Sequence, residues 1–210
     1  MRSKPAGLLA LVLLLCCLFP AAAQGVKVDA LKLYTDGKYE QSRAAALAEI
    51  SADPKNIEAY VVVCWDLLAL ERWADAENYA LKAYEVRKDP RITEILGESA
   101  YRLGRNDAAL RHFQNYIAAV LEGARVGSAY YYIGEIYLRM ARYSHADIAF
   151  STALQYTPEN ARWWARLGWA REKANDTKAA LEAYESALRL EPRLEDALLG
   201  KERVLAAMRG

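Results

Sequence analysis

An eight-position pattern occurs twice in the second half of the chain, with a constant separation of 34 residues. The first copy consists of Tyr130, Ile133, Gly134, Tyr137, Ala146, Phe150, Ala153 and Pro158. The second copy consists of Trp164, Leu167, Gly168, Arg171, Ala180, Tyr184, Ala187 and Pro192. A unit of this length cannot bury an apolar face alone, so the spacing predicts units stacked into a solenoid.

Each copy of the pattern predicts two helices that pack against each other. Its first four positions fall at i, i+3, i+4 and i+7, which places them on one face of a helix. Gly134 and Gly168 on that face have no side chain, so a second helix can approach closely there. Pro158 and Pro192 then end the second helix. The sequence therefore predicts an all-α fold built from helical hairpins.

This order of residues resembles the tetratricopeptide repeat, whose period is about 34 residues. Only Arg171 departs from the pattern, because the family usually has tyrosine there. The resemblance implies an α-α superhelix of about five hairpins, in which the first helices line an inner, concave surface. Repeats are predicted at 23–56, 57–89, 90–123, 127–160 and 161–194.

A capping helix is predicted at 195–210, after the fifth repeat. Leu198, Leu205 and Met208 recur at spacings that put them broadly on one side of this helix. We expect these three side chains to pack on the fifth repeat. The helix would then present its other side to solvent and close the end of the solenoid.

The first three repeats are less regular. Helices are expected at 26–36 and 39–51 in the first repeat, and the second repeat has Cys64 where later repeats have glycine. A small, buried and unreactive thiol is the expected role of Cys64. In the third repeat, a separation three residues longer than the period predicts about one extra helical turn ending near Glu122, with Gly123 as a left-handed cap.

Residues 1–23 have the pattern of a secretory signal peptide. Arg2 and Lys4 precede an unbroken run of 12 apolar residues, and three alanines precede Gln24. Cleavage before Gln24 would give a periplasmic or secreted protein. Two alternatives are a membrane anchor, which would need roughly 20 apolar residues, and a lipid attached to Cys16 or Cys17.

Composition disfavours several functional classes. Without residues 1–23 the chain has 26 basic and 27 acidic residues, a net charge of −1, so it lacks the basic excess typical of nucleic-acid binding. His112 and His145 fall in different hairpins, and no phosphate-binding loop or pair of metal-ligand residues is present. We expect neither catalysis nor a cofactor or metal ion.

The resemblance also predicts which side chains face the inner surface. Positions 2, 5, 9, 12 and 13 of each repeat line a groove in this family. The residues predicted to bind a partner there are Val61, Trp65, Leu68, Glu94, Glu98, Tyr101, Tyr131, Glu135, Leu138, Arg162 and Trp169. The alternative is that some of them pack between neighbouring repeats.

An aromatic lining of mixed charge suits a peptide or a helix better than a polyanion. Trp65, Tyr131 and Trp169 are the predicted aromatic anchors. The predicted function is a non-enzymatic scaffold or adaptor that holds another protein of the bacterial cell envelope. The alternative is an accessory ligand-binding subunit associated with a solute transporter, which a closed apolar pocket would favour.

Overall fold

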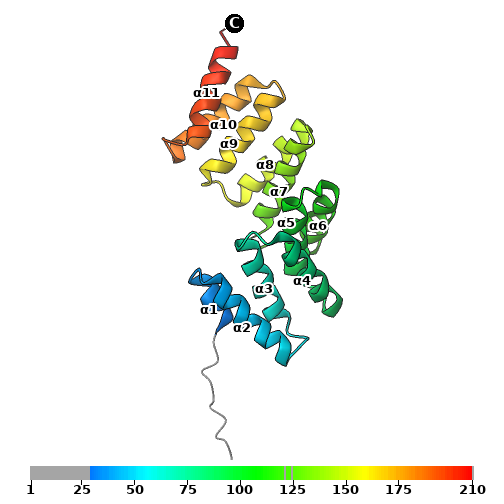
Figure 1. Cartoon of the computed structure of the whole chain (residues 1–210). Helices are drawn as coiled ribbons and strands as arrows, with labels where there is room; N and C mark the ends of the chain where they lie inside the picture. The colour runs from blue at the N-terminus through cyan, green and yellow to red at the C-terminus, as the bar shows by residue number, and fades with distance from the viewer. Residues whose placement is uncertain (1–28, 121, 124, 210) are drawn as a thin grey trace, which may run out of the picture.

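The computed structural model describes residues 29–120, 122–123 and 125–209, and these residues form helices and no strand (Figure 1). The helices are α1 (Ala30–Thr35), α2 (Tyr39–Ala52), α3 (Ile57–Ala69), α4 (Trp73–Val86), α5 (Pro90–Arg102), α6 (Asn106–Ala119), α7 (Val126–Arg139), α8 (Tyr143–Tyr156), α9 (Ala161–Lys173), α10 (Thr177–Leu190) and α11 (Glu195–Ala207). The predicted all-α solenoid is confirmed.

Each helix packs mainly against the next one in the chain, and the array runs from α1 at one end to α11 at the other (Figure 1). The odd-numbered helices are the first helices of the hairpins. Four neighbouring pairs of them also touch across repeats, namely α1 with α3, α3 with α5, α5 with α7, and α9 with α11. The core is therefore a continuous series of clusters between neighbouring helices.

The turn inside every hairpin contains one residue in the left-handed backbone region. These residues are Gly37, Glu71, Gly104, Ala141 and Asn175. Side chains such as Asn56 and Asp89 cap several following helices by accepting a hydrogen bond from a backbone N–H of the first turn. Local sequence thus determines where most hairpins begin and turn.

Close contact between the helices of a hairpin depends on glycine. A β-carbon on the glycine of α5, α7 or α9 would lie 2.9, 2.7 or 2.7 Å from an aromatic ring of the following helix. In the second repeat the small Ala80 occupies the position of that ring, and Cys64 packs in the same cluster. Cys64 is fully buried, as predicted, and burial raises the pKa of its thiol to about 12.

Two predicted helix boundaries are wrong. The helix expected at 26–36 begins only at Ala30, because Asp29 accepts a hydrogen bond from the N–H of Lys32 and caps it. The extra turn after Ala119 is absent: α6 has 14 residues, like α8 and α10, and Val120 is extended. The longer spacing instead lies in the connection to α7, where Arg125 reaches Glu94, with 2.7 Å between Nη2 and Oε1.

The predicted packing face of the capping helix is also wrong. Leu198 and Met208 are 42% and 51% exposed, whereas Ala197, Gly200 and Val204 are buried. Small residues are needed on this face because the ring of Tyr184 presses against it, so that a β-carbon on Gly200 would lie 2.2 Å from Cζ. Leu198 takes the position that packs on a second helix in complete repeats, and no described helix follows α11.

The predicted signal peptide, with Cys16 and Cys17, lies outside the described residues. Among the helices that the structure describes, none is both long and apolar enough to cross a membrane.

Candidate partner-binding groove

The predicted groove residues fall into two groups when their burial is compared. Five are buried between neighbouring helices, namely Val61, Glu94, Glu98, Tyr101 and Glu135. The other six retain exposed surface, namely Trp65, Leu68, Tyr131, Leu138, Arg162 and Trp169. The structure thus places the first group in contacts between neighbouring repeats, which is the alternative to partner binding at these positions. Only the second group offers side-chain surface to a partner.

A ladder of ion pairs joins the first helices across successive repeats. In each pair a glutamate of one first helix meets an arginine of the next repeat. The ladder consists of Glu58 with Arg91, Glu94 with Arg125, Glu135 with Arg166, and Glu172 with Arg203. The first pair and the last two are bidentate, and in the last two Nε and Nη2 of the arginine donate to the two carboxylate oxygens at 2.5–2.9 Å. Bidentate pairs fix the guanidinium plane as well as its position.

The two partners in the ladder are unequally exposed. Glu94, Glu135 and Glu172 have only 1–17% of their side-chain surface exposed, whereas their arginines have 34–47%. The carboxylates therefore lie beneath the surface and the guanidinium groups cover them. Glu58 is the exception, because its side chain is 68% exposed.

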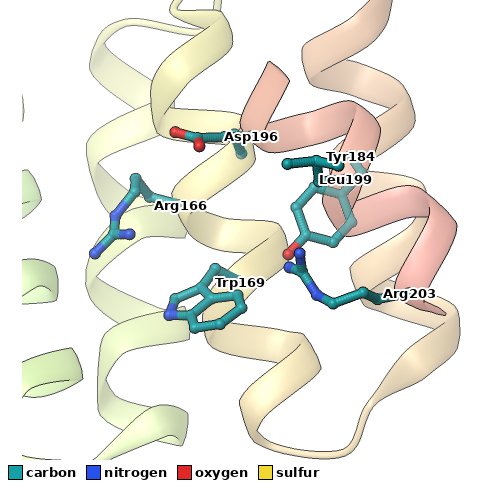
Figure 2. Close-up of a pocket in the computed structure, with 7 residues that line it drawn as sticks. Arg166, Trp169, Tyr184, Asp196, Leu199 and Arg203 are labelled. Carbon is teal, nitrogen blue, oxygen red and sulfur yellow. The ribbon is translucent and has the colours of Figure 1, made fainter. Parts of the chain in front are cut away.

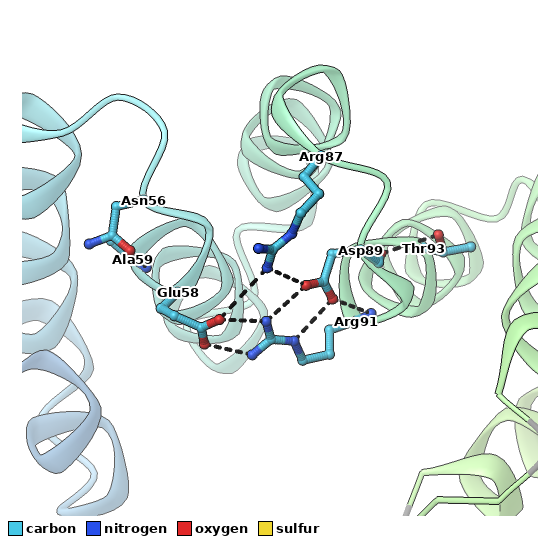
Figure 3. Close-up of polar contacts among 7 residues, drawn as sticks. All are labelled: Asn56, Glu58, Ala59, Arg87, Asp89, Arg91 and Thr93. Carbon is cyan, nitrogen blue, oxygen red and sulfur yellow. Dashed lines mark hydrogen bonds and ion pairs between the residues drawn. The ribbon is translucent and has the colours of Figure 1, made fainter.

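The N-terminal end of the ladder contains a second carboxylate (Figure 3). Arg91 donates to Glu58 through Nη1 and Nη2 at 2.7 Å and to Asp89 through Nε at 3.0 Å. Arg87 also donates to Asp89, at 2.8 Å. The hydrogen bonds from Arg91 hold the pKa of Asp89 well below its usual range and lower the pKa of Glu58. This end of the face is a closed polar network with its charges paired.

The middle of the ladder is the most deeply buried part. Burial raises the pKa of Glu94, and the nearby Arg125 opposes that shift. The hydroxyl of Tyr132 donates to Glu98 at 2.7 Å. Arg139 donates to the carbonyl of Tyr101 at 2.8 Å. The Glu98 carboxylate and the Tyr101 backbone carbonyl therefore already have partners within the protein.

Sequence reasoning missed the arginines at positions 125, 166 and 203. A signal for them was present, because each follows its glutamate by 31 residues, close to the repeat period. The signal is weak by itself, since glutamate and arginine are common in helices of this chain.

The three predicted aromatic anchors have different surroundings. Tyr131 is stacked on Trp163 of the next repeat, with ring centroids 5.1 Å apart and planes inclined by 14°. Trp65 contacts Tyr34 of α1, at a centroid distance of 5.6 Å. Tyr131 and Trp65 therefore help to join repeats, while Trp169 lies between cationic groups at the edge of a pocket.

We call this hollow the Trp169 pocket; it lies between α9 and α11 and has a volume of about 270 Å³ (Figure 2). Its lining consists of Ala165, Arg166, Trp169, Tyr184, Asp196, Leu199 and Arg203. The Arg203 guanidinium lies 5.0 Å from the centre of the indole, and Nζ of Lys173 lies 4.4 Å from it. The pocket combines an apolar surface with two guanidinium groups, an arrangement suited to binding.

The described residues contain no group of three or more His, Cys, Asp or Glu side chains that could hold a metal ion. The inner face instead combines paired charges, half-buried aromatic rings and one pocket, which can recognise the side chains of another polypeptide.

Comparison with known proteins identifies the repeat. The tetratricopeptide repeat model matches residues 65–120, 96–146 and 131–195. Anaphase-promoting complex subunit 3 of Schizosaccharomyces pombe is 22% identical over 185 residues, which are 85% of this chain and 27% of that protein. The chain therefore spans about a quarter of that curated relative.

Two solved structures show the same fold. One is YrrB, described as a tetratricopeptide protein with an unusual peptide-binding site, with a TM-score of 0.67, 18% identity, and coverage of 82% of this chain and 88% of that one. The other is pilF of Pseudomonas aeruginosa, with a TM-score of 0.76, 15% identity, and coverage of 86% of this chain and 81% of that one. With its family model matched from residue 65 to residue 195, the chain belongs to the tetratricopeptide repeat family.

Proposed function

We propose that this protein is a non-enzymatic scaffold that binds a segment of another protein along the inner face of its first helices. The Trp169 pocket is the principal contact. The observation that carries the proposal is a half-buried tryptophan in an accessible pocket, on a face where the carboxylates of Glu94 and Glu135 are already paired with arginines. Buried aromatic anchors in pockets are the side chains that dominate binding energy in protein interfaces.

The family supports this role in general terms, because tetratricopeptide proteins bind peptides or proteins. The peptide-binding site in the description of YrrB belongs to that protein, and it makes a peptide a reasonable ligand for the same fold here.

The proposed setting is the bacterial cell envelope, and the proposed partner is another exported protein. Support for this setting comes from the signal-peptide pattern of residues 1–23. Lipid attachment at Cys16 or Cys17 remains the alternative and would keep the protein on a membrane surface.

The accessory subunit of a solute transporter is the less supported function. A site for a small hydrophobic molecule would be mainly apolar. The Trp169 pocket instead includes Arg166, Asp196 and Arg203 in its lining. A mainly apolar hollow of about 390 Å³ between α6, α7 and α8 is open to solvent and is therefore not the closed pocket that this function would favour.

The test is capture of the native partner by chemical crosslinking in intact cells, followed by affinity purification and mass spectrometry. Trp169→Ala removes the proposed anchor, and Trp73→Ala is the matched control, because Trp73 is also half-buried but lies outside the pocket at the start of α4. We expect the first variant to lose the partner and the second to retain it. If Trp169→Ala captures the same proteins as wild type in the same yield, the inner face is not the binding site.

A further inference from the structure

We propose that the Trp169 pocket binds an acidic side chain together with a neighbouring apolar one, so that the partner segment is an acidic peptide. This inference rests on the function proposed above and adds the chemistry of the partner. It is carried by the free donors, the exposed charges and the apolar surface of the pocket.

The two arginines of the pocket present unused hydrogen-bond donors. Arg166 pairs with Glu135 through Nε and Nη2, and Arg203 pairs with Glu172 through the same two atoms. Nη1 of each guanidinium forms no hydrogen bond with any residue that the structure describes. Figure 2 shows the two guanidinium groups on opposite sides of the Trp169 indole. A carboxylate in the pocket can therefore accept hydrogen bonds without breaking an existing ion pair.

The carboxylates that neutralise these arginines are behind the surface. The side chains of Glu135 and Glu172 are 11% and 17% exposed, compared with 34% and 47% for Arg166 and Arg203. An approaching ligand meets the positive end of each pair first. The ion pairs also hold the guanidinium groups in place, so less side-chain entropy is lost on binding.

A further positive charge lies beside the pocket. Nζ of Lys173 lies 4.4 Å from the centre of the Trp169 indole. Lys173 forms no ion pair within the described part of the chain. Asp196 is the one acidic residue among the lining residues, and it comes from the first turn of α11. The cationic groups of this region therefore outnumber its accessible carboxylates.

The apolar part of the pocket defines the second half of the ligand. Trp169 and Leu199 belong to different helices and both line the pocket. Leu199 is 48% exposed, which leaves apolar surface for a partner to cover. An acidic residue beside a leucine or aromatic residue would place its carboxylate near an arginine and its apolar neighbour on the indole.

Direct binding of synthetic peptides tests this chemistry. The probe is a fluorescein-labelled peptide of glutamates around a central leucine, blocked at both termini, and its counterpart has lysine in place of every glutamate. The purified protein should bind the glutamate peptide, and added salt should weaken binding because the charges are partly exposed. Equal or tighter binding of the lysine peptide would overturn the inference.

Two substitutions on α11 give matched controls. Leu199→Glu places a negative charge in the pocket and should weaken binding of the glutamate peptide about tenfold, as expected for a like charge at short range. Leu198→Glu adds the same charge one residue earlier, at a position of similar exposure that does not line the pocket, and should have little effect. Equal effects of the two variants would show that the peptide binds elsewhere.

A third substitution is expected to strengthen peptide binding, a result that partial unfolding of the variant could not produce. Asp196→Asn removes the one acidic group of the lining and should strengthen binding of the glutamate peptide severalfold. Glu195→Gln, at an exposed neighbouring position outside the lining, is the control. Unchanged or weaker binding by Asp196→Asn would contradict the inference.

The proposed function and this inference can fail separately. If Trp169→Ala loses the native partner while the glutamate peptide does not bind wild type, the inner face binds a segment of different chemistry. If Trp169→Ala keeps the native partner, the proposed site itself is wrong.

Discussion

Replacing Asp66 by alanine is expected to stabilise the protein at neutral pH. Asp66 is fully buried in α3, and neither of its carboxylate oxygens has a hydrogen-bond partner among the described residues. The nearby Ser42 hydroxyl donates instead to the carbonyl of Ala30, at 2.8 Å. The corresponding residues of α5 and α9 are Ser99 and Ala170, which are both fully buried and uncharged. Ala170 therefore shows that alanine fits this position in a repeat.

The magnitude follows from the pKa of the carboxyl group. Burial raises the pKa of Asp66 from 3.8 to about 6, while the nearby Ser42 hydroxyl and Arg43 lower it and Glu40 raises it by smaller amounts. A shift of this size corresponds to a cost of about 3 kcal/mol when the group is ionised in both the folded and the unfolded states. The pKa of Asp66 is higher in the folded state than in the unfolded state. The free-energy cost of ionising Asp66 is therefore absent well below pH 3.8, grows between pH 3.8 and 6, and is complete above pH 6. Stability should therefore be lost as the pH rises through about 6.

The assay is urea unfolding of wild type and Asp66→Ala at pH 8 and pH 4, followed by circular dichroism. The variant should gain about 2.5 kcal/mol more unfolding free energy relative to wild type at pH 8 than at pH 4, because pH 4 lies just above the unfolded pKa of 3.8 and a small part of the cost is already present there. Comparing the two proteins at each pH removes the titration of their other carboxylates. Glu85→Ala, at an exposed position of α4, should show no such dependence. A variant less stable than wild type at pH 8, with no dependence on pH, would refute the reasoning.

Three further predictions concern the cap, a turn and the N-terminus. Gly200→Ala should destabilise the protein by about 1–3 kcal/mol, because its β-carbon would lie 2.2 Å from the ring of Tyr184; an unchanged urea midpoint would contradict close packing of α11. Ala141→Gly should raise the melting temperature, because the left-handed backbone at φ 54° costs alanine about 1 kcal/mol; a lower melting temperature would count against this. N-terminal sequencing of the exported protein should begin at Gln24, and a lipid-modified cysteine would exclude this cleavage site.

The sequence alone predicted the repeat and the helical hairpin. Helical periodicity and the constant 34-residue spacing act within one hairpin, so they can be read locally. The contact of Gly168 with Tyr184 is an example: glycine leaves space on the first helix, and the large ring on the second helix of the same hairpin fills it. Burial of Cys64 followed from the same register.

Only the tertiary structure decided which polar side chains of the inner face are available to a partner. Glu94 and Glu135 occupy positions that the family pattern assigns to the groove, yet they are buried under arginines of the next repeat. Their burial depends on how successive repeats stack, and the periodicity within one helix contains no information about that geometry. The packing face of α11 was predicted wrongly for the same reason. The ring of Tyr184 lies so close to α11 that only the small Gly200 fits against it, and the larger leucines lie elsewhere on the helix.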